Sequence, residues 1–481
     1  MSFISIPFVV LFITVFLLYY LVKKPLLKKV ILLLGSAAFI GYFHISFLII
    51  AMVVALITYL LGFKIAKARE KKNIGWLYLS SVLLIIFIWI AFRYPVLIGD
   101  FANYLLSFLH IHSRVPEHSI LVPLGISFYS FQAISYLTEI YWEEIEPEDN
   151  FMDFSIYMLF FMKFLSGPIE RPDSFLLQVK EDKSFNYDLV VYGLKLFFLG
   201  LMKKTLIADN LAPCIEDVYG SLNDYTGVQL VVIMLMYPIQ LYADFSGYTD
   251  MALGGAMMFG YKLMNNFDRP FISKTTTELW RRWHISLSSW VRDYVYLPLT
   301  STIRSWGKAG VSLSLFISFV VVGVWHGTNW NFVIYGSIQG LIIIYEMYTA
   351  DFHNKISKTT IGSKVYNAYA ILITFLLFAF SLIFFRADNL TDALYYISHL
   401  SLADIDSIKD FRVGLTDKAY LVTGISFVML LIFEHFNSKK DLINATKSLP
   451  GFVRWSIYFV FVCIVIFSGH FSNDNFVYAI F

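Results

Sequence analysis

Long apolar runs recur along this chain, and they constrain its fold more than any other feature. A membrane-spanning helix needs about 20 mostly apolar residues, because the hydrocarbon core of a bilayer is about 30 Å thick. We expect about 11 true spans, because several runs are marginal, and we expect the short stretch 249–260 to be re-entrant. The candidate runs are 3–22, 30–43, 45–63, 76–98, 121–142, 151–168, 188–207, 227–243, 310–326, 330–349, 366–385, 418–434 and 452–470.

The composition supports the same class of protein. Hydrophobic residues make up 58% of the chain and charged residues 15%, against about 45–50% and about 25% in soluble domains. The chain is therefore expected to be an all-α, polytopic membrane protein rather than a soluble enzyme or a disulfide scaffold. The net charge of +2 does not indicate nucleic-acid binding. Cys214 and Cys463 stand in no metal-binding spacing, so no metal site is predicted.

Basic residues in short loops mark the cytoplasmic side of a membrane protein. They gather in segments 23–29, 64–72 (which includes Lys72) and 261–308, and at the pair Lys203–Lys204. These segments are expected inside, which places the N-terminus outside. By the same alternation, the acidic loop around Asp404 is expected outside.

The whole chain, 1–481, is expected to form one integral-membrane domain, because neither a Pro- or Ser-rich linker nor an internal repeat is evident. Within it we distinguish three parts by the distribution of polar motifs. N-terminal helices occupy 1–120, a motif-rich core occupies 121–345, and C-terminal helices occupy 346–481.

Polar residues at membrane depth usually face a bundle interior or a water-filled path. In FLSGPIERP (Phe164–Pro172), helix-breaking Gly and Pro precede Glu170 and Arg171. This pattern fits an interfacial helix end with a local ion pair, or a broken helix lining a cavity. In QLYADFSGYTD, Asp244 and Asp250 flank Gly247. They could pin the re-entrant element or contact a ligand.

An aromatic stripe follows in LWRRWHISLSSWVRDYVYL, residues 279–297, where Trp280, Trp283, Leu287, Trp290 and Tyr294 recur at helical spacing. The stripe predicts an amphipathic interfacial helix, with Arg281, Arg282 and Arg292 on other faces. His284 lies beside it, where a histidine is usually a packing residue.

His326 is the best candidate base in the chain. It stands in GVWHGTNW at the end of an apolar run, next to Trp325 and Gly327. The pKa of a free imidazole, about 6.5, suits proton transfer near neutrality. Small neighbours permit close approach of backbone or ligand. A packing role or a metal site are the competing interpretations.

Taken together, these motifs resemble the membrane-bound O-acyltransferase (MBOAT) family, and most of all its bacterial alginate O-acetyltransferase branch. The complete set of motifs, in this order, is a specific indicator of the family, although each motif alone is a weak one. The matching stretches are 121–137, SGPI at 166–169, KKTLIADNLA at 203–212, DFSGYTDMALG at 244–254, 278–299, 323–336, FFRA at 384–387 and NFVYAIF at 475–481.

The resemblance implies a ring of tilted helices, with re-entrant and interfacial helices, around a thin centre. There a cytoplasmic donor tunnel meets an extracytoplasmic acceptor funnel. His326 matches the catalytic histidine and His284 the second histidine-or-asparagine position. Gln339 departs from relatives that often carry a histidine. Side chains that could line the donor or substrate path are Asp244, Asp250, Arg281, Arg282, Trp283, Trp325 and Asn329.

The expected reaction moves an acetyl group from acetyl-CoA to a hydroxyl of an exported or cell-wall polysaccharide, across the bacterial cytoplasmic membrane. An extracytoplasmic partner protein is expected to accept the group first, on a Ser or Tyr hydroxyl. No permanently bound cofactor is expected. Two alternatives remain: D-alanyl transfer to teichoic acid, and a transporter of polysaccharide or acyl groups without chemistry.

Overall fold

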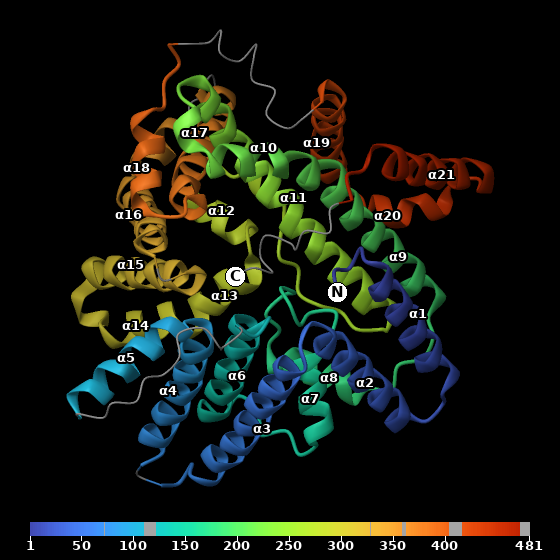
Figure 1. The fold of residues 1–481 in the computed structure, drawn as a ribbon, viewed down its shortest axis with the longest axis vertical. Helices are drawn as coiled ribbons and strands as arrows, with labels where there is room; N and C mark the ends of the chain where they lie inside the picture. Colours follow the sequence, from blue (N-terminus) through green and yellow to red (C-terminus); the bar gives the residue numbers. More distant parts are fainter. Residues whose placement is uncertain (72, 110–121, 328, 358–361, 404–415, 472–481) are drawn as a thin grey trace. The chain divides into compact units, whose positions relative to one another are not determined.

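The computed structural model describes residues 1–71, 73–109, 122–327, 329–357, 362–403 and 416–471 (Figure 1). Helices dominate these ranges, and no β-strand forms within them. The all-α prediction is therefore confirmed. Four features singled out in the sequence lie outside the described residues: Lys72, Thr328 of the GVWHGTNW motif, Asp404 and the closing motif 475–481.

One compact unit comprises Met1–Gly193 and Gly255–Met264. Every residue of α6 from Ile126 to Ile140 is buried, so α6 lies in the core of this unit, with α3 and α4 packed against it. The helices of this unit are α1 (Ile6–Leu21), α2 (Pro25–Phe43), α3 (Ile45–Lys67), α4 (Ile74–Arg93), α5 (Pro95–Phe108), α6 (Ile126–Tyr141), α7 (Phe151–Leu159) and α8 (Pro172–Lys180).

A second compact unit comprises Leu194–Gly254 and Asn265–Phe481. Both candidate histidines belong to it. Its first half holds α9 (Tyr187–Met202, which begins in the other unit), the π-helix η1 (Lys203–Ala208), α10 (Asp209–Gly220), η2 (Leu222–Asp224), α11 (Val228–Met258, which ends in the other unit), η3 (Pro270–Ile272), α12 (Thr276–Arg282), α13 (Ile285–Val291), the π-helix η4 (Arg292–Tyr296) and α14 (Leu297–Thr302). Its second half holds η5 (Arg304–Trp306), α15 (Gly307–His326), α16 (Trp330–Ser357), α17 (Gly362–Arg386), α18 (Leu390–Ser398), α19 (Asp417–Asn437), α20 (Leu442–Ala445), η7 (Thr446–Ser448) and α21 (Gly451–Ser468).

Within the described residues, 9 helices are long and apolar enough to cross a membrane: α2, α3, α4, α11, α15, α16, α17, α19 and α21. Four of the candidate runs are missing from this set. The run 3–22 forms α1, which has only 16 residues. The run 121–142 forms α6 and the run 188–207 forms α9, each 16 residues long, and 151–168 forms only the 9 residues of α7. The multi-pass class is confirmed. The single-domain division at about residues 120 and 345 stays a prediction.

Two sequence predictions are wrong in their local structure. The stretch 249–260 is not a separate re-entrant element, because α11 continues as one 31-residue helix through Gly247 to Met258. The stretch 279–297 is not one interfacial helix, because the chain breaks at Trp283–His284 and continues as α13 and η4. Helical spacing of side chains does not reveal a single residue with a left-handed backbone.

Candidate active site

His326 ends α15 in a buried position. Its imidazole is 2% exposed and lies edge-to-face with the Phe385 ring, with 4.9 Å between ring centres. Glycine residues near His326 allow the start of α16 to pack closely against the end of α15. A Cβ on Gly327 would lie 2.2 Å from the Phe332 ring, and a Cβ on Gly323 would lie 2.1 Å from the Phe332 carbonyl oxygen. The close packing of α15 against α16 therefore requires glycine at positions 323 and 327.

His284 occupies the break between α12 and α13 in a left-handed conformation, with φ 45° and ψ 52°. A non-glycine residue in this region costs about 1–3 kcal/mol, and such residues cluster at functional sites. Asn266 supports the turn, because its carbonyl oxygen accepts the Ile285 N–H at 2.9 Å and its side-chain oxygen accepts the Ser286 N–H at 3.1 Å. The imidazole is 1% exposed and packs 4.8 Å from the Phe245 ring.

The two histidines approach each other at Trp325. The centre of its ring lies 4.7 Å from that of His326 and 6.1 Å from that of His284. Burial, and secondly the His326 imidazole, hold the pKa of His284 well below its usual range. His284 is therefore neutral at pH 7, with one ring nitrogen able to donate a hydrogen bond and the other able to accept one.

Asp244 and Asp250 form ion pairs with two buried lysines. The Lys204 ammonium lies 2.6 Å from Asp244 and 2.8 Å from Asp209, and the Lys203 ammonium lies 2.8 Å from Asp250. Both lysines stand in η1 and are at most 7% exposed, so they are not loop charges that report topology. The ion pairs favour the structural interpretation of the two aspartates, as ties between α11 and η1.

Two facing glycines bring α9 close enough for these ion pairs. A Cβ on Gly200 would lie 2.4 Å from the Gly247 carbonyl oxygen, and a Cβ on Gly247 would lie 2.7 Å from the Gly200 carbonyl oxygen. The backbones of α9 and α11 are thus in contact at this point. Gly247 serves close helix packing, and the helix is regular there.

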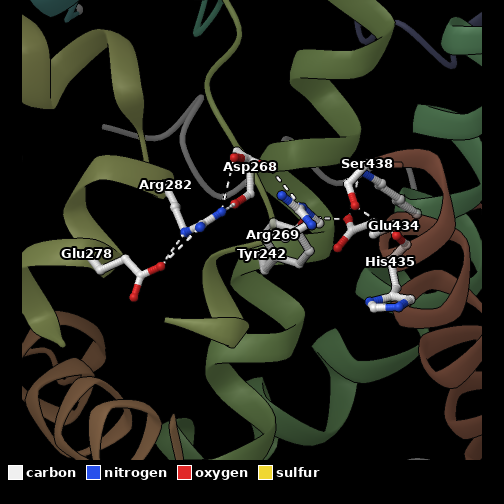
Figure 2. A network of polar contacts seen from close by, with 9 residues as sticks. Tyr242, Asp268, Arg269, Glu278, Arg282, Glu434, His435 and Ser438 are labelled. Atoms are coloured by element: carbon white, nitrogen blue, oxygen red, sulfur yellow. Dashed lines mark hydrogen bonds and ion pairs between the residues drawn. The ribbon is translucent and has the colours of Figure 1, made fainter. Parts of the chain in front are cut away.

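Arg282 belongs to a polar network at the surface of α12 (Figure 2). Its guanidinium lies 3.0 Å from Glu278 and 3.0 Å from Asp268, which also pairs with Arg269 at 2.9 Å. Two carboxylates therefore already balance the Arg282 charge. Arg281 is exposed and forms no ion pair among the described residues, so it is the better placed of the two arginines to meet an anionic donor.

Trp283 and Asn329 occupy different environments. Trp283 is 2% exposed and packs 5.0 Å from the Phe378 ring, so it is part of the core beneath His284. Asn329 is exposed, and its side-chain amide donates to the Asp388 carbonyl oxygen at 3.0 Å. Their roles along a substrate path stay predictions.

Gln339, where the sequence was expected to depart from the family pattern, has a defined structural role. Its side-chain oxygen accepts the Trp280 indole N–H at 2.9 Å, and its amide nitrogen donates to the Ser381 hydroxyl at 2.7 Å. Gln339 is fully buried. It joins α12, α16 and α17 through one acceptor and one donor on the same side chain.

The FLSGPIERP segment lies in the other unit and is non-helical, as its Gly and Pro predicted. The break begins earlier than expected, because α7 already ends at Leu159. The Glu170 carboxylate is 1% exposed and accepts the Met264 N–H at 2.7 Å. The Lys163 ammonium donates to the Tyr157 carbonyl oxygen at 2.5 Å and is 3% exposed. This segment is a buried polar turn rather than an interfacial helix end.

Several residues of the site escaped the sequence analysis. Phe385 and Phe245 contact the histidines. They lie in the motifs FFRA and DFSGYTDMALG, but no feature of those motifs marks either ring as a neighbour of a histidine. Glu434 accepts a hydrogen bond from the Tyr242 hydroxyl and lies 3.7 Å from Lys203, and its one visible signal is a lone acid near the end of an apolar run. Among the described residues, no group of three or more His, Cys, Asp or Glu side chains is placed to hold a metal ion.

Comparison with known proteins gives a consistent set of relatives. A sequence model of the MBOAT, membrane-bound O-acyltransferase family, matches residues 32–386. A probable alginate O-acetylase of Pseudomonas aeruginosa is 32% identical over 88% of this chain and 80% of its own length. A peptidoglycan O-acetyltransferase of Helicobacter pylori is 30% identical, over 80% and 75%. A teichoic acid D-alanyltransferase of Bacillus subtilis is 28% identical, over 75% and 94%.

Proposed function

Because the chain belongs to the membrane-bound O-acyltransferase family, we propose that it moves an acetyl group from cytoplasmic acetyl-CoA to a hydroxyl outside the bacterial cytoplasmic membrane. O-Acyl transfer by a multi-pass membrane protein follows from the family. The acetyl group is supported by relatives named as alginate and peptidoglycan O-acetyltransferases. We further propose an exported or cell-wall polysaccharide as the final acceptor, with an extracytoplasmic partner protein as the relay.

His326 acts as the general base. A thioester is already activated, so the remaining barrier is the weak nucleophilicity of a neutral alcohol. The His326 imidazole takes the hydroxyl proton while the oxygen attacks the thioester carbonyl, and a tetrahedral intermediate forms. The carbon–sulfur bond then breaks, and the thiolate recovers the proton from the imidazolium. A positioned base typically contributes about 10²–10⁴-fold to such a reaction.

The observation that carries this proposal is the meeting of two buried imidazoles at Trp325, within 4.7 Å and 6.1 Å of its ring. A neutral His284 is able to donate a hydrogen bond to the oxyanion of the intermediate, which is the charge that needs stabilising. The Trp325 indole N–H is a second possible donor. Membership of an acyltransferase family favours this chemistry over the transport-only alternative.

The test compares His326→Ala with His435→Ala, a control that removes an exposed histidine. Purified protein in lipid vesicles receives acetyl-CoA and a small hydroxyl acceptor, and release of free CoA is followed. His326→Ala should elute normally on size exclusion and lose about 10²–10⁴-fold in rate, whereas the control should match the wild type. If His326→Ala keeps more than about a tenth of the wild-type rate, His326 is not the base.

The same vesicles distinguish the alternatives. A carrier-bound D-alanyl thioester offered in place of acetyl-CoA tests D-alanyl transfer, for which the 28% identity to the teichoic acid enzyme is the supporting observation. A polysaccharide acceptor offered to the protein alone tests the relay. Efficient acetylation of polysaccharide without a partner would refute the relay and leave the acyltransferase intact.

A further inference from the structure

A basic pocket opens at the connection between α3 and α4, far in sequence from either histidine. It has a volume of about 380 Å³ and is lined by Lys64, Lys67, Ala68, Lys71, Asn73 and Leu77. Lys64 and Lys67 are three residues apart in the last turn of α3 and share one face of the helix. Lys71 follows in the turn after the helix and lines the same pocket. No residue of this pocket has a role in the proposed acyl transfer.

The lysines of the pocket keep their charges available. Neighbouring Arg69 is engaged, because its guanidinium lies 2.6 Å from Glu146 and donates to the carbonyl oxygens of Ile140 and Ile145 at 3.3 and 3.1 Å. Among the described residues, no carboxylate forms an ion pair with the three pocket lysines. Arg69 therefore fixes the connection, and three exposed ammonium groups converge on one concave site.

The pocket lies at the level of lipid headgroups. It occupies the short connection between two consecutive candidate spans, which must lie at a membrane surface. Trp76, directly before the pocket residue Leu77, is 75% exposed, as expected for an aromatic residue at the membrane–water interface. The density of basic residues in this connection predicts the cytoplasmic face, where anionic lipids are recognised by basic pockets between helices.

An apolar stripe leads from the pocket into the membrane. Leu56 and Leu60 precede Lys64 at intervals of four residues on α3, and they are 44% and 50% exposed. Residues four apart share one helix face, so a headgroup held by Lys64 would have its acyl chains along these leucines. A soluble phosphate compound would gain nothing from this stripe.

We propose that the Lys64–Lys67–Lys71 pocket binds the phosphate headgroup of an anionic membrane lipid. Each lysine that contacts the headgroup of a lipid in this pocket contributes about fivefold to its affinity, so the three together contribute about 100-fold, whereas lysines elsewhere on the protein do not contact that lipid. The site holds lipid whether or not the protein transfers acyl groups, so its test needs no donor.

The experiment is native mass spectrometry of the full-length protein in detergent, titrated with phosphatidylglycerol or phosphatidylcholine. Wild-type protein should retain phosphatidylglycerol adducts in preference to phosphatidylcholine, and Lys64→Gln/Lys67→Gln/Lys71→Gln should lose about 100-fold in that affinity. Replacement of the same three lysines by arginine should preserve it. The matched control Lys23→Gln/Lys24→Gln/Lys308→Gln removes three other exposed lysines and should bind as the wild type does.

Three outcomes would overturn the proposal. The first is an unchanged phosphatidylglycerol affinity of the glutamine variant, and the second is an equal loss in the control, which would indicate diffuse surface charge. The third is displacement of the lipid by glycerol phosphate at similar concentration, which would indicate a soluble ligand. A photoactivatable phosphatidylglycerol on the wild-type protein gives an independent measurement, since its cross-links should map to residues 56–77 and not elsewhere.

Discussion

Substitution of Lys204 by Met tests whether buried charges, and not apolar packing alone, hold the helices around the two histidines. The Lys204 ammonium pairs with Asp244 at 2.6 Å and Asp209 at 2.8 Å, and all three side chains are at most 4% exposed. Methionine preserves most of the aliphatic length and removes the charge. Two buried carboxylates then lose the cation that they share.

The size of the effect follows from this count of charges. Loss of one partner from a buried ion pair costs about 3–5 kcal/mol, because the remaining charge is desolvated without compensation. Lys204→Met should lie at the upper end, since two carboxylates are affected. Asp244→Asn should cost only about 1.5–3 kcal/mol, the value of a hydrogen bond to a charged group. In that variant Lys204 still pairs with Asp209, and the asparagine oxygen can accept from it.

The free energy of unfolding is measured by titration of the purified protein with a denaturing detergent in mixed micelles, followed by tryptophan fluorescence. Lys439→Met, which removes an exposed lysine, is the matched control and should lie within about 0.5 kcal/mol of the wild type. Lys204→Met/Asp244→Asn should be more stable than Lys204→Met alone. The argument is refuted if Lys204→Met behaves like the control, or if Asp244→Asn is the more damaging single change.

Three further predictions address packing, pH and topology. Gly247→Ala should destabilise by about 1–3 kcal/mol, because its Cβ would meet backbone of α9, whereas Gly424→Ala, with nothing within 4 Å, should not; both are measured by the same titration. Burial lowers the pKa of His284, so the unfolded chain binds a proton more readily below about pH 6.5. The free energy of unfolding should therefore have its full value above that pH and fall by up to about 1.4 kcal/mol per pH unit below it. His284→Gln should remove this dependence on pH. Single cysteines are introduced at Lys308 and Asp404 in a cysteine-free background, and intact cells are treated with an impermeant maleimide. Position 404 should be labelled and position 308 should not, and labelling at 308 would contradict the positive-inside assignment.

The class of fold follows from the sequence because long apolar runs have few alternatives in a membrane. Their boundaries are less certain, because interior helices need not match the bilayer. α6 is 16 residues long and buried on nearly every side, so its apolar composition reflects burial in protein. For α11 the sequence prediction was wrong in the other direction, because it divided what is one helix. Asp244 and Asp250 suggested a break in the helix, yet the helix continues, and buried lysines pair with both carboxylates.

The residues of the candidate site could be predicted where sequence motifs contain them, but their arrangement could not. His326 stands out by its glycine neighbours and by proton chemistry, and the family motif adds His284. Their meeting at Trp325 depends on the turn at His284, whose left-handed φ of 45° has no signature in the spacing of the aromatic stripe. The sequence alone predicts a loop charge at Lys203, because its acidic partners lie 47 residues or more away in the chain.

The strained turn at His284 explains why ion pairs and close glycine contacts accompany this site. A residue in the left-handed region persists only where its surroundings determine the conformation. Here Asn266 fixes the backbone, and the Phe245 ring on α11 fixes the imidazole. The helix α11 is itself held through Asp244, the immediate neighbour of Phe245, and through Gly247. A misplacement of about 1 Å can cost a catalytic group about 10²-fold in rate. If His284 takes part in the proposed transfer, we therefore expect the charges buried near it to matter for its position, even where apolar packing would give the protein equal stability.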